Sequence, residues 1–370
     1  MITLLICTVA FAVGMLYLVL IRRYDRYEPE PLLKMLIAML LGGVCSVSIS
    51  LVLYEFFPVQ GTVFHAIAYI GPIEEFSKLA ALWIVYLVIS KEFNEPVDGV
   101  IYVSCVALGF ATIENVMYSM SSEKPFALLL IRSVLCVVGH MAFSCYLGFA
   151  FYIQVQTKKN ISGIIVALVL ASLGHGIYDG ILFGTGITNI AIGFVVLLVI
   201  VQLGIVKYCL SISNFKLNYH EQLFEQTTIT HTAYCSHCED DRQATVRHFQ
   251  NIIISECESC ESHIIPAKDF KKLLRWFRPM ISWRRFKQFN RIDERNVHFL
   301  DETKSIIYNS PSGWHTFKKE HFQVWLDGGN NRDIDRLAKK NIAGWILRII
   351  GFEWSKELPH LKHHRHSENI

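Results

Sequence analysis

Seven long apolar segments fill the first 212 residues and constrain the fold more than any other feature of the sequence. A helix of about 20 apolar residues crosses the hydrocarbon core of a bilayer. The sequence therefore predicts an all-α polytopic membrane bundle of about seven transmembrane helices. The expected segments are residues 2–21, 32–55, 61–90, 97–120, 125–155, 161–183 and 188–211.

Charge divides the chain into two regions. Residues 1–212 contain 11 Lys/Arg and 12 Asp/Glu, whereas residues 213–370 contain 24 and 20. The second region is richer in charge and net positive, which is typical of a water-exposed region. We expect a membrane core at 1–212 and a small soluble α+β region after it. That region would contain a linker at 213–230, a zinc ribbon at 231–266 and a basic, amphipathic part at 267–370.

Basic residues cluster on one side of the apolar segments. The first segment is followed by Arg22, Arg23, Arg26 and Lys34, the third by Lys91, and the fifth by Lys158 and Lys159. Cytoplasmic connections of membrane proteins are enriched in Lys and Arg. We therefore expect the amino terminus outside and the carboxyl-terminal region in the cytosol. The first segment has no basic n-region and no small-residue cleavage site, so we expect a retained helix and not a signal peptide.

The third segment contains Gly71 and Pro72. Proline lacks a backbone donor but is well placed in the first turn of a helix. We expect a short outer helix or re-entrant piece, followed by a helix that begins near Pro72.

Ionisable side chains inside four of these segments are the main sign of function. Each costs a few kcal/mol at the bilayer centre, so such groups face the bundle interior and find partners. The helical rise of 1.5 Å per residue places Glu75, His140 and His175 at a similar depth, about 20 Å from one face. We expect one shared buried layer. Its members are Glu74, Glu75 and Lys78, Glu114 and Asn115, Arg132 and His140, and His175 and Asp179.

Structural roles explain some of these residues one at a time. Glu74 and Lys78 are four residues apart, which suits a structural ion pair on one helix face. Arg132 is most simply a snorkelling or acid-pairing residue near the outer side. Glu95 and Asp98 lie at the inner water boundary and need no function. A structural explanation accounts less well for so many polar groups at one depth.

The residue types in this layer suit the activation of water. A carboxylate in an apolar site serves as a general base or acid near neutral pH. Imidazoles bind metal or polarise a carbonyl, and an asparagine amide such as that of Asn115 donates to a developing oxyanion. Proton-coupled transporters also place acids and histidines at the midplane. A transporter or a non-catalytic scaffold is therefore the alternative, although no convincing internal repeat favours transport.

Four short motifs carry a resemblance to a known family. They are YDRYEPEP after the first segment, EEFSK at Glu74, FATIEN at Glu114 and HGIYD at His175. Together they resemble the PrsW family of intramembrane proteases, and more distantly the CAAX prenyl proteases. The resemblance implies an intramembrane endopeptidase of a bacterial inner membrane. Its expected substrates are single-span membrane proteins, and its expected role is regulatory proteolysis such as cleavage of anti-sigma factors.

The resemblance also implies roles for individual residues. Glu75 or Glu74 would be the general base, and Lys78 would hold or tune one of them. Asn115 would serve the oxyanion, and Asp179 would orient His175. Glu114, His140 and His175 would bind a catalytic Zn²⁺ or other divalent metal, or would contact water and carbonyl directly. Three protein ligands plus water is the pattern of a catalytic zinc, but the HExxH spacing is absent.

Two C-x₂-C pairs follow the membrane region. Cys235 and Cys238 are separated from Cys257 and Cys260 by a strand-like stretch. This spacing predicts a structural Cys₄ zinc ribbon. A cytosolic, reducing location favours thiolate–metal bonds over two disulfides.

Residues 268–295 hold ten basic and three acidic residues interleaved with aromatics. Near a membrane this pattern favours an interfacial helix that binds anionic lipid. Nucleic-acid contact and a solvated basic face are the alternatives, and of the two ligands we expect lipid. The apolar stretch 341–354 is too short to span, so we expect an amphipathic or docking helix. The sequence indicates no oligomeric state.

Overall fold

The computed structural model describes most of the chain in two compact units, residues 1–213 with 337–370, and residues 214–336. The described residues are 2–186, 189–215, 219, 225–235, 237–249, 252–266, 269, 298–300, 305–309, 314–317, 342–355 and 358. Apart from residue 269, the basic stretch 268–295 lies outside them, and so does the end of the chain from 359. The lipid-binding helix expected in that stretch therefore stays a prediction.

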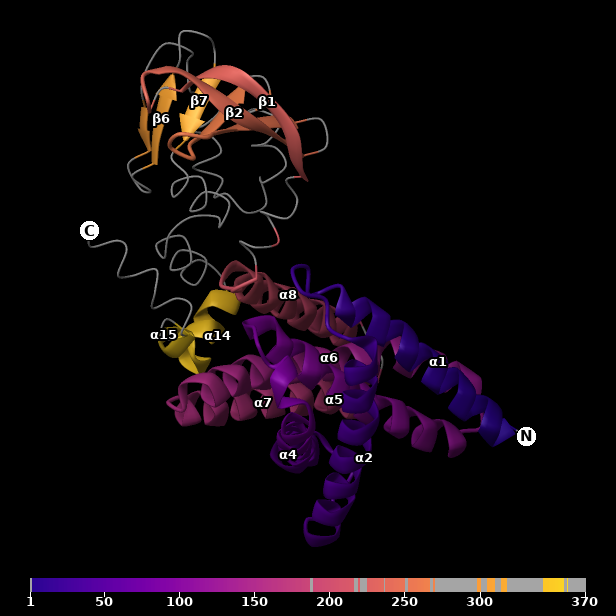
Figure 1. The fold of residues 1–370 in the computed structure, drawn as a ribbon. Helices are drawn as coiled ribbons and strands as arrows, with labels where there is room; N and C mark the ends of the chain where they lie inside the picture. Colours follow the sequence, from indigo (N-terminus) through magenta and orange to yellow (C-terminus); the bar gives the residue numbers. More distant parts are fainter. Residues whose placement is uncertain are drawn as a thin grey trace. The chain divides into compact units, whose positions relative to one another are not determined.

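The first unit is a helical bundle (Figure 1). Its main helices are α1 (Ile2–Arg22), α2 (Leu32–Phe56), α3 (Val63–His65), α4 (Gly71–Ile89), α5 (Pro96–Met120), α6 (Pro125–Thr157), α7 (Ile161–Thr185) and α8 (Asn189–Ser211). Six of them, all except α3 and α4, are long and apolar enough to cross a membrane. The predicted helical membrane bundle is confirmed. The central helix is α5, against which α1, α2, α4, α6 and α8 all pack.

The third apolar segment is divided as the proline predicted. The short helix α3 continues through a π-helical turn, Ala66–Ile70, into α4. Helix α4 begins at Gly71, and Pro72 occupies its first turn. The three charged residues of α4 lie in the first half of the helix, and this number of charges sets α4 apart from the six spanning helices.

Close backbone contact fixes α4 and its π-helical turn against α7. A Cβ atom added to Gly71 would lie 2.3 Å from the carbonyl oxygen of Ser172, and one added to Gly176 would lie 2.6 Å from that of Ala66. Small residues permit this approach between membrane helices. Both glycines adjoin the ionisable residues of the buried layer, so their contact sets the position of that layer.

The second unit is an antiparallel sheet in its described part. Its strands are β1 (Glu225–Cys235), β2 (Asp240–Phe249), β3 (Ile252–Cys257), β4 (His263–Pro266), β5 (His298–Leu300), β6 (Ser305–Asn309) and β7 (Trp314–Phe317). They lie in the order β1-β2-β3-β4-β7-β6-β5. The pair β2–β3 forms the strands expected between the two C-x₂-C pairs, with Phe249 opposite Ile252.

Two short helices return to the first unit after the sheet. They are α14 (Ile342–Ile350) and α15 (Phe352–Ser355), and α14 packs on α7 and α8. The Asn160 side-chain amide donates to the carbonyl oxygen of Ile350 at 2.9 Å. The Tyr208 and Ser355 hydroxyls hydrogen-bond at 2.7 Å. The expected docking helix is therefore present.

Candidate active site

Glu75 is held by three hydrogen bonds from three directions. Its Oε1 accepts from Lys78 Nζ at 2.6 Å and faces His175 Nδ1 at 3.0 Å. Its Oε2 accepts from the Ser144 hydroxyl at 2.7 Å. Glu75 and Lys78 are fully buried. The carboxylate of Glu75 is therefore fixed between α4, α6 and α7, with neither oxygen left free.

The neighbouring Glu74 is different, because one of its oxygens is unpaired. Its Oε1 accepts from the Tyr54 hydroxyl at 2.9 Å. Its Oε2 is buried and has no hydrogen-bond partner among the described residues. The nearest polar atoms are His175 Nε2 at 3.6 Å and Lys78 Nζ at 4.0 Å. Glu74 thus offers a carboxylate oxygen, available as a proton acceptor, beside a histidine ring.

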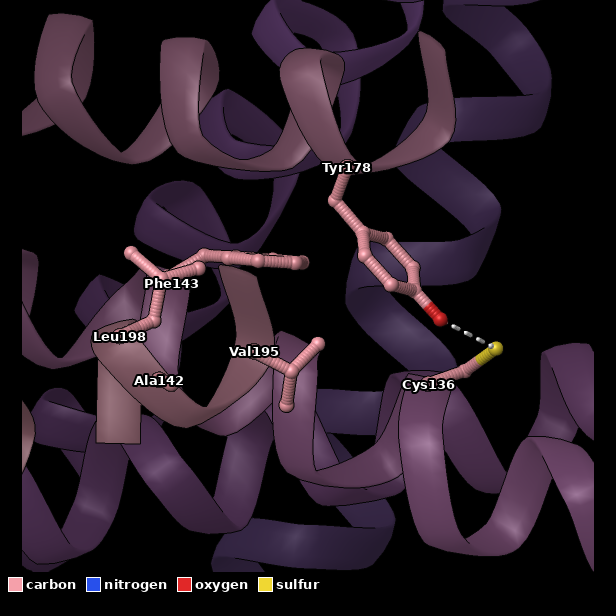
Figure 2. Packing of buried hydrophobic residues seen from close by; sticks show 6 residues of the cluster. All are labelled: Cys136, Ala142, Phe143, Tyr178, Val195 and Leu198. Carbon is pink, nitrogen blue, oxygen red and sulfur yellow. Dashed lines mark hydrogen bonds between the residues drawn. The ribbon is translucent and has the colours of Figure 1, made fainter. Parts of the chain in front are cut away.

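His175 is oriented by its contacts with Glu75 and Phe143. Because Nδ1 contacts the Glu75 carboxylate, that nitrogen donates and Nε2 faces the oxygen atoms of Glu74 and Asp179. The Phe143 ring stacks on the imidazole at 4.9 Å and 18°. Figure 2 shows Phe143 within the apolar cluster formed by Cys136, Ala142, Tyr178, Val195 and Leu198. The core of α6, α7 and α8 therefore supports one face of His175.

His140 contacts Lys78 and Glu114 through opposite ring nitrogens. Lys78 Nζ lies 2.8 Å from Nδ1, and Glu114 Oε2 lies 3.0 Å from Nε2. An ammonium group only donates, so Nδ1 accepts and Nε2 carries the ring hydrogen. The Lys78 ammonium also lies 4.6 Å from the centre of the Phe110 ring, a cation–π contact. His140 is therefore set as an Nε2–H donor.

Arg132 extends the network on the far side of His140. Its Nη2 pairs with Glu114 Oε2 at 2.8 Å, and its Nε donates to Asn115 Oδ1 at 2.8 Å. The acid pairing expected for Arg132 is confirmed. The two histidine rings lie 4.8 Å apart and nearly perpendicular. The structure thus links all eight predicted membrane-site residues through direct contacts, while their catalytic roles stay predictions.

The ligands available for a metal differ from the expected trio. Ligand atoms of Glu74, His140 and His175 lie within 4.8 Å of one another, whereas Glu114 pairs with Arg132 and His140. This donor set does not fit a metal ion as arranged. Both ring nitrogens of His140 are already engaged, Nδ1 with Lys78 and Nε2 with Glu114, and the Lys78 ammonium supplies a positive charge beside Glu74 and Glu75.

Comparison with known proteins agrees with these motifs. A family model described as "PrsW family intramembrane metalloprotease" matches residues 30–205. Protease PrsW of Clostridioides difficile is 32% identical over 48% of this chain and 78% of that protein. Protease PrsW of Oceanobacillus iheyensis is 33% identical over 47% of this chain and 82% of that protein. This chain belongs to the PrsW family. No solved structure matches it significantly.

Membership of the PrsW family makes this chain an intramembrane protease and an integral membrane protein. The matched region contains the whole membrane network, from Tyr54 to Asp179. It ends before the described strands of the second unit, so the family match does not account for the cysteine sheet.

Sequence reasoning missed Tyr54 and Ser144, which bond the two glutamates. Ser144 lies one turn after His140, and Arg132, Cys136, His140 and Ser144 repeat every four residues on one face of α6. That spacing was a usable signal for Ser144. Tyr54 lies near the end of an apolar helix far from any motif, so nothing in the sequence marked it.

Gly176 provides a test of how the α4–α7 contact positions the site. In Gly176→Val, we expect cleavage to fall about 100-fold, because a displacement of about 1 Å in a site has effects of that order. We expect a loss of about 1–3 kcal/mol in unfolding free energy from overpacking. Cleavage of a membrane-anchored reporter and thermal unfolding in detergent measure both effects. Gly193→Val on α8 is the control, since a Cβ there meets nothing within 4 Å. Equal cleavage by both variants would contradict this role.

The four cysteines of the second unit form a tetrad. One ligand atom from each of Cys235, Cys238, Cys257 and Cys260 lies within 4.8 Å of all the others. The residue after each pair, Glu239 or Glu261, has a positive φ of 55° or 56°. The two C-x₂-C turns therefore share one backbone shape. Burial raises the pKa of the Cys235 thiol to about 11, so a positive partner is needed to hold it as a thiolate.

Metal content provides a test of both metal predictions at once. We expect the purified chain to hold one zinc per molecule, and Cys235→Ser with Cys257→Ser to hold none. The four thiols suit structural zinc, whereas the membrane donors do not fit a metal. Elemental analysis after extensive dialysis measures the stoichiometry. An equivalent of zinc that survives the cysteine substitutions would show a metal in the membrane network.

Proposed function

We propose that this chain hydrolyses peptide bonds of single-span, membrane-anchored proteins, with Glu74 as the base that activates water. The observation that best supports this proposal is the state of Glu74 Oε2. This oxygen is buried, has no hydrogen-bond partner among the described residues and lies 3.6 Å from His175 Nε2. A buried carboxylate oxygen is costly to leave unpaired. A water bound there would satisfy it and would be positioned to lose a proton.

The remaining residues hold Glu74 and the substrate carbonyl in position. As water adds to the carbonyl carbon, its proton passes to Glu74 Oε2. Breaking the C–N bond then needs a proton on the leaving nitrogen, which Glu74 returns directly or through His175 Nε2. Glu75 fixes the orientation of His175, and Lys78 neutralises Glu75. No step is assigned to a metal.

We assign stabilisation of the oxyanion to Asn115, as the sequence predicts. The one ring hydrogen of His140 lies on Nε2 and is donated to Glu114, so it is not available to the substrate. Preorganised donors aimed at developing charge contribute about 3 kcal/mol each to catalysis. The Oδ1 of Asn115 accepts from Arg132, which fixes the side-chain amide and leaves its nitrogen as the donor end. Arg132 also pairs with the Glu114 carboxylate beside His140.

The location and orientation of the chain are part of the proposal. We place it in a bacterial inner membrane, with the amino terminus outside and the cysteine unit in the cytosol, on the distribution of Lys and Arg. This orientation needs seven crossings, so it counts α4 as a crossing in addition to the six spanning helices. Membrane-anchored regulators such as anti-sigma factors are then the proposed substrates. We retain a membrane core at 1–212, a linker at 213–230, a ribbon at 231–266 and a basic region at 267–370. Strand β1 begins within the proposed linker, and α14 of the last region packs on the membrane core.

Cleavage in proteoliposomes tests the function. We expect the purified chain to cleave a single-span reporter, and His175→Ala to be slower by at least about 100-fold, since general acid–base groups contribute at least that much. Gel analysis of the reporter measures the rate. His65→Ala, in the exposed α3, should cleave at the wild-type rate. Absence of cleavage by wild type, with or without proton flux, would contradict the proposal.

A further inference from the structure

A second cluster of buried acids lies away from the active site, where the α1–α2 connection meets the start of α5. Asp25 and Glu30 belong to the connection, and Glu95 and Asp98 to the first turn of α5 and its cap. All four are at most 2% exposed. Ligand atoms of Asp25, Glu95 and Asp98 lie within 4.8 Å of one another. The Tyr102 hydroxyl donates to Glu30.

Backbone amides donate hydrogen bonds to only one carboxylate oxygen of each aspartate. Asp98 Oδ2 accepts from the backbone amides of Asn94 and Glu95 at 2.8 and 2.6 Å. Asp25 Oδ1 accepts from those of Tyr27 and Glu28 at 3.1 and 3.0 Å. Asp98 Oδ1 and Asp25 Oδ2 are buried without a hydrogen-bond partner in the described part of the chain. Both oxygens of Glu95 are buried there too, beside Ser213 and Asp25, without a hydrogen bond of good geometry.

Nearby basic residues do not compensate this charge. Arg22 Nε donates to the backbone carbonyl of Glu30 at 2.7 Å, and Lys34 pairs with Glu92 at 3.4 Å. Within the described residues, no Lys, Arg or His forms an ion pair with any of the four carboxylates. Removing several carboxylates from water without a counter-charge costs several kcal/mol for each of them. A positive charge supplied from solution would remove that cost.

We propose that Asp25, Glu95 and Asp98 bind a hard divalent cation, Mg²⁺ or Ca²⁺, with Glu30 beside them. Their donors are all carboxylate oxygens, which these ions prefer and softer metals do not select. The neighbouring residues Arg26 and Glu28 are exposed, so the cluster lies close to the surface of the connection. The ion joins the α1–α2 connection to the first turn of α5.

This site is structural and distinct from the active site. Helix α5 also carries Glu114, which lies about 24 Å farther along the helix at 1.5 Å per residue. The ion therefore cannot contact the reacting groups. It stabilises the end of the helix on which Glu114 and Asn115 are positioned, and its removal lowers the melting temperature of the chain.

The full chain in detergent, freed of metal by a chelator and dialysed, provides the test. We expect Mg²⁺ or Ca²⁺ alone, added at about 100 times the dissociation constant, to raise the melting temperature by about 5 °C or more. Glu95→Gln and Asp25→Asn should lose this shift. Glu28→Gln, an exposed acid of the same connection, should keep it. No shift in wild type, or an equal shift in Glu95→Gln, would overturn the proposal.

Terbium luminescence of the wild-type chain provides a measurement that does not depend on whether a variant folds. Tyr102 lies against Glu30, so it should transfer energy to Tb³⁺ bound in this cluster. We expect saturable, tyrosine-excited emission from the wild-type chain that Ca²⁺ or Mg²⁺ displaces. The emission should fall at least tenfold in Glu95→Gln. Wild-type emission that is absent, or that neither cation displaces, would also overturn the proposal.

Discussion

Glu74→Gln should abolish cleavage while leaving the bundle intact. The amide cannot accept a proton from water, and general base catalysis contributes about 100-fold to 10,000-fold. We therefore expect a rate at least about 1,000-fold below wild type in the proteoliposome assay. Since Oε2 of Glu74 has no hydrogen-bond partner among the described residues, a neutral amide removes a buried, incompletely paired charge. We expect the unfolding free energy to stay equal or to rise.

The combination of lost activity with retained stability separates Glu74 from its neighbour. Glu75→Gln should also lose activity, but it breaks the contact with Lys78 and should destabilise the chain. Glu55→Gln, an exposed acid of α2, should behave as wild type in both assays. If Glu74→Gln keeps wild-type cleavage, or if Glu75→Gln alone loses it without any loss of stability, Glu75 and not Glu74 is the base.

The sequence was sufficient to predict that Glu75, His140 and His175 meet. Each lies at a similar depth in an apolar segment, and depth follows from the helical rise alone. Ionisable side chains inside membrane segments must face the interior of the helical bundle, so these three residues had to share it. The helices, the short piece before Pro72 and the sheet strands between the cysteine pairs follow from patterns that are local in the sequence.

The sequence could not distinguish Glu74 from Glu75. Adjacent residues on a helix differ by about 100° in direction, and the orientation of α4 depends on contacts with other helices. Ser144 on α6 and His175 on α7 occupy the oxygens of Glu75, whereas Tyr54 on α2 takes only one oxygen of Glu74. These partners come from segments 20 to 100 residues away. Which glutamate these distant side chains hydrogen-bond to cannot be read from the sequence around the glutamates.

The acids at the start of α5 also have an environment that the sequence could not predict. Glu95 and Asp98 were expected to be unremarkable boundary residues, because a charge near the membrane surface is normally in water. Packing of the α1–α2 connection buries both and adds Asp25 and Glu30 to them. The return of α14 to α7 and α8 is likewise a long-range contact that depends on Asn160, far from it in the sequence.

The buried pair of Lys78 and Glu75 should dominate the stability of the membrane unit. Both side chains are fully buried, and their charged atoms lie 2.6 Å apart. Lys78→Met leaves the Glu75 carboxylate without its cation in a dry interior, which costs about 3–5 kcal/mol when a buried pair is broken. Glu75→Gln leaves the ammonium unpaired and should cost a similar amount. Equilibrium unfolding in mixed micelles measures both losses.

The double variant gives the decisive comparison, because it removes both charges together. If the two losses arise from one interaction, Lys78→Met with Glu75→Gln should lose about 2 kcal/mol less than the sum of the two single losses. Lys34 and Glu92, an ion pair at 3.4 Å with more exposed side chains, form the control. The same pair of substitutions at Lys34 and Glu92 should give a coupling below about 1 kcal/mol.

If the Lys78 and Glu75 losses simply add, then His140 and Ser144 compensate the separated charges, and Lys78 acts mainly through the hydrogen position on His140. The double variant should remain inactive in either case, because His140 loses its contact with Lys78 and His175 loses the Glu75 carboxylate.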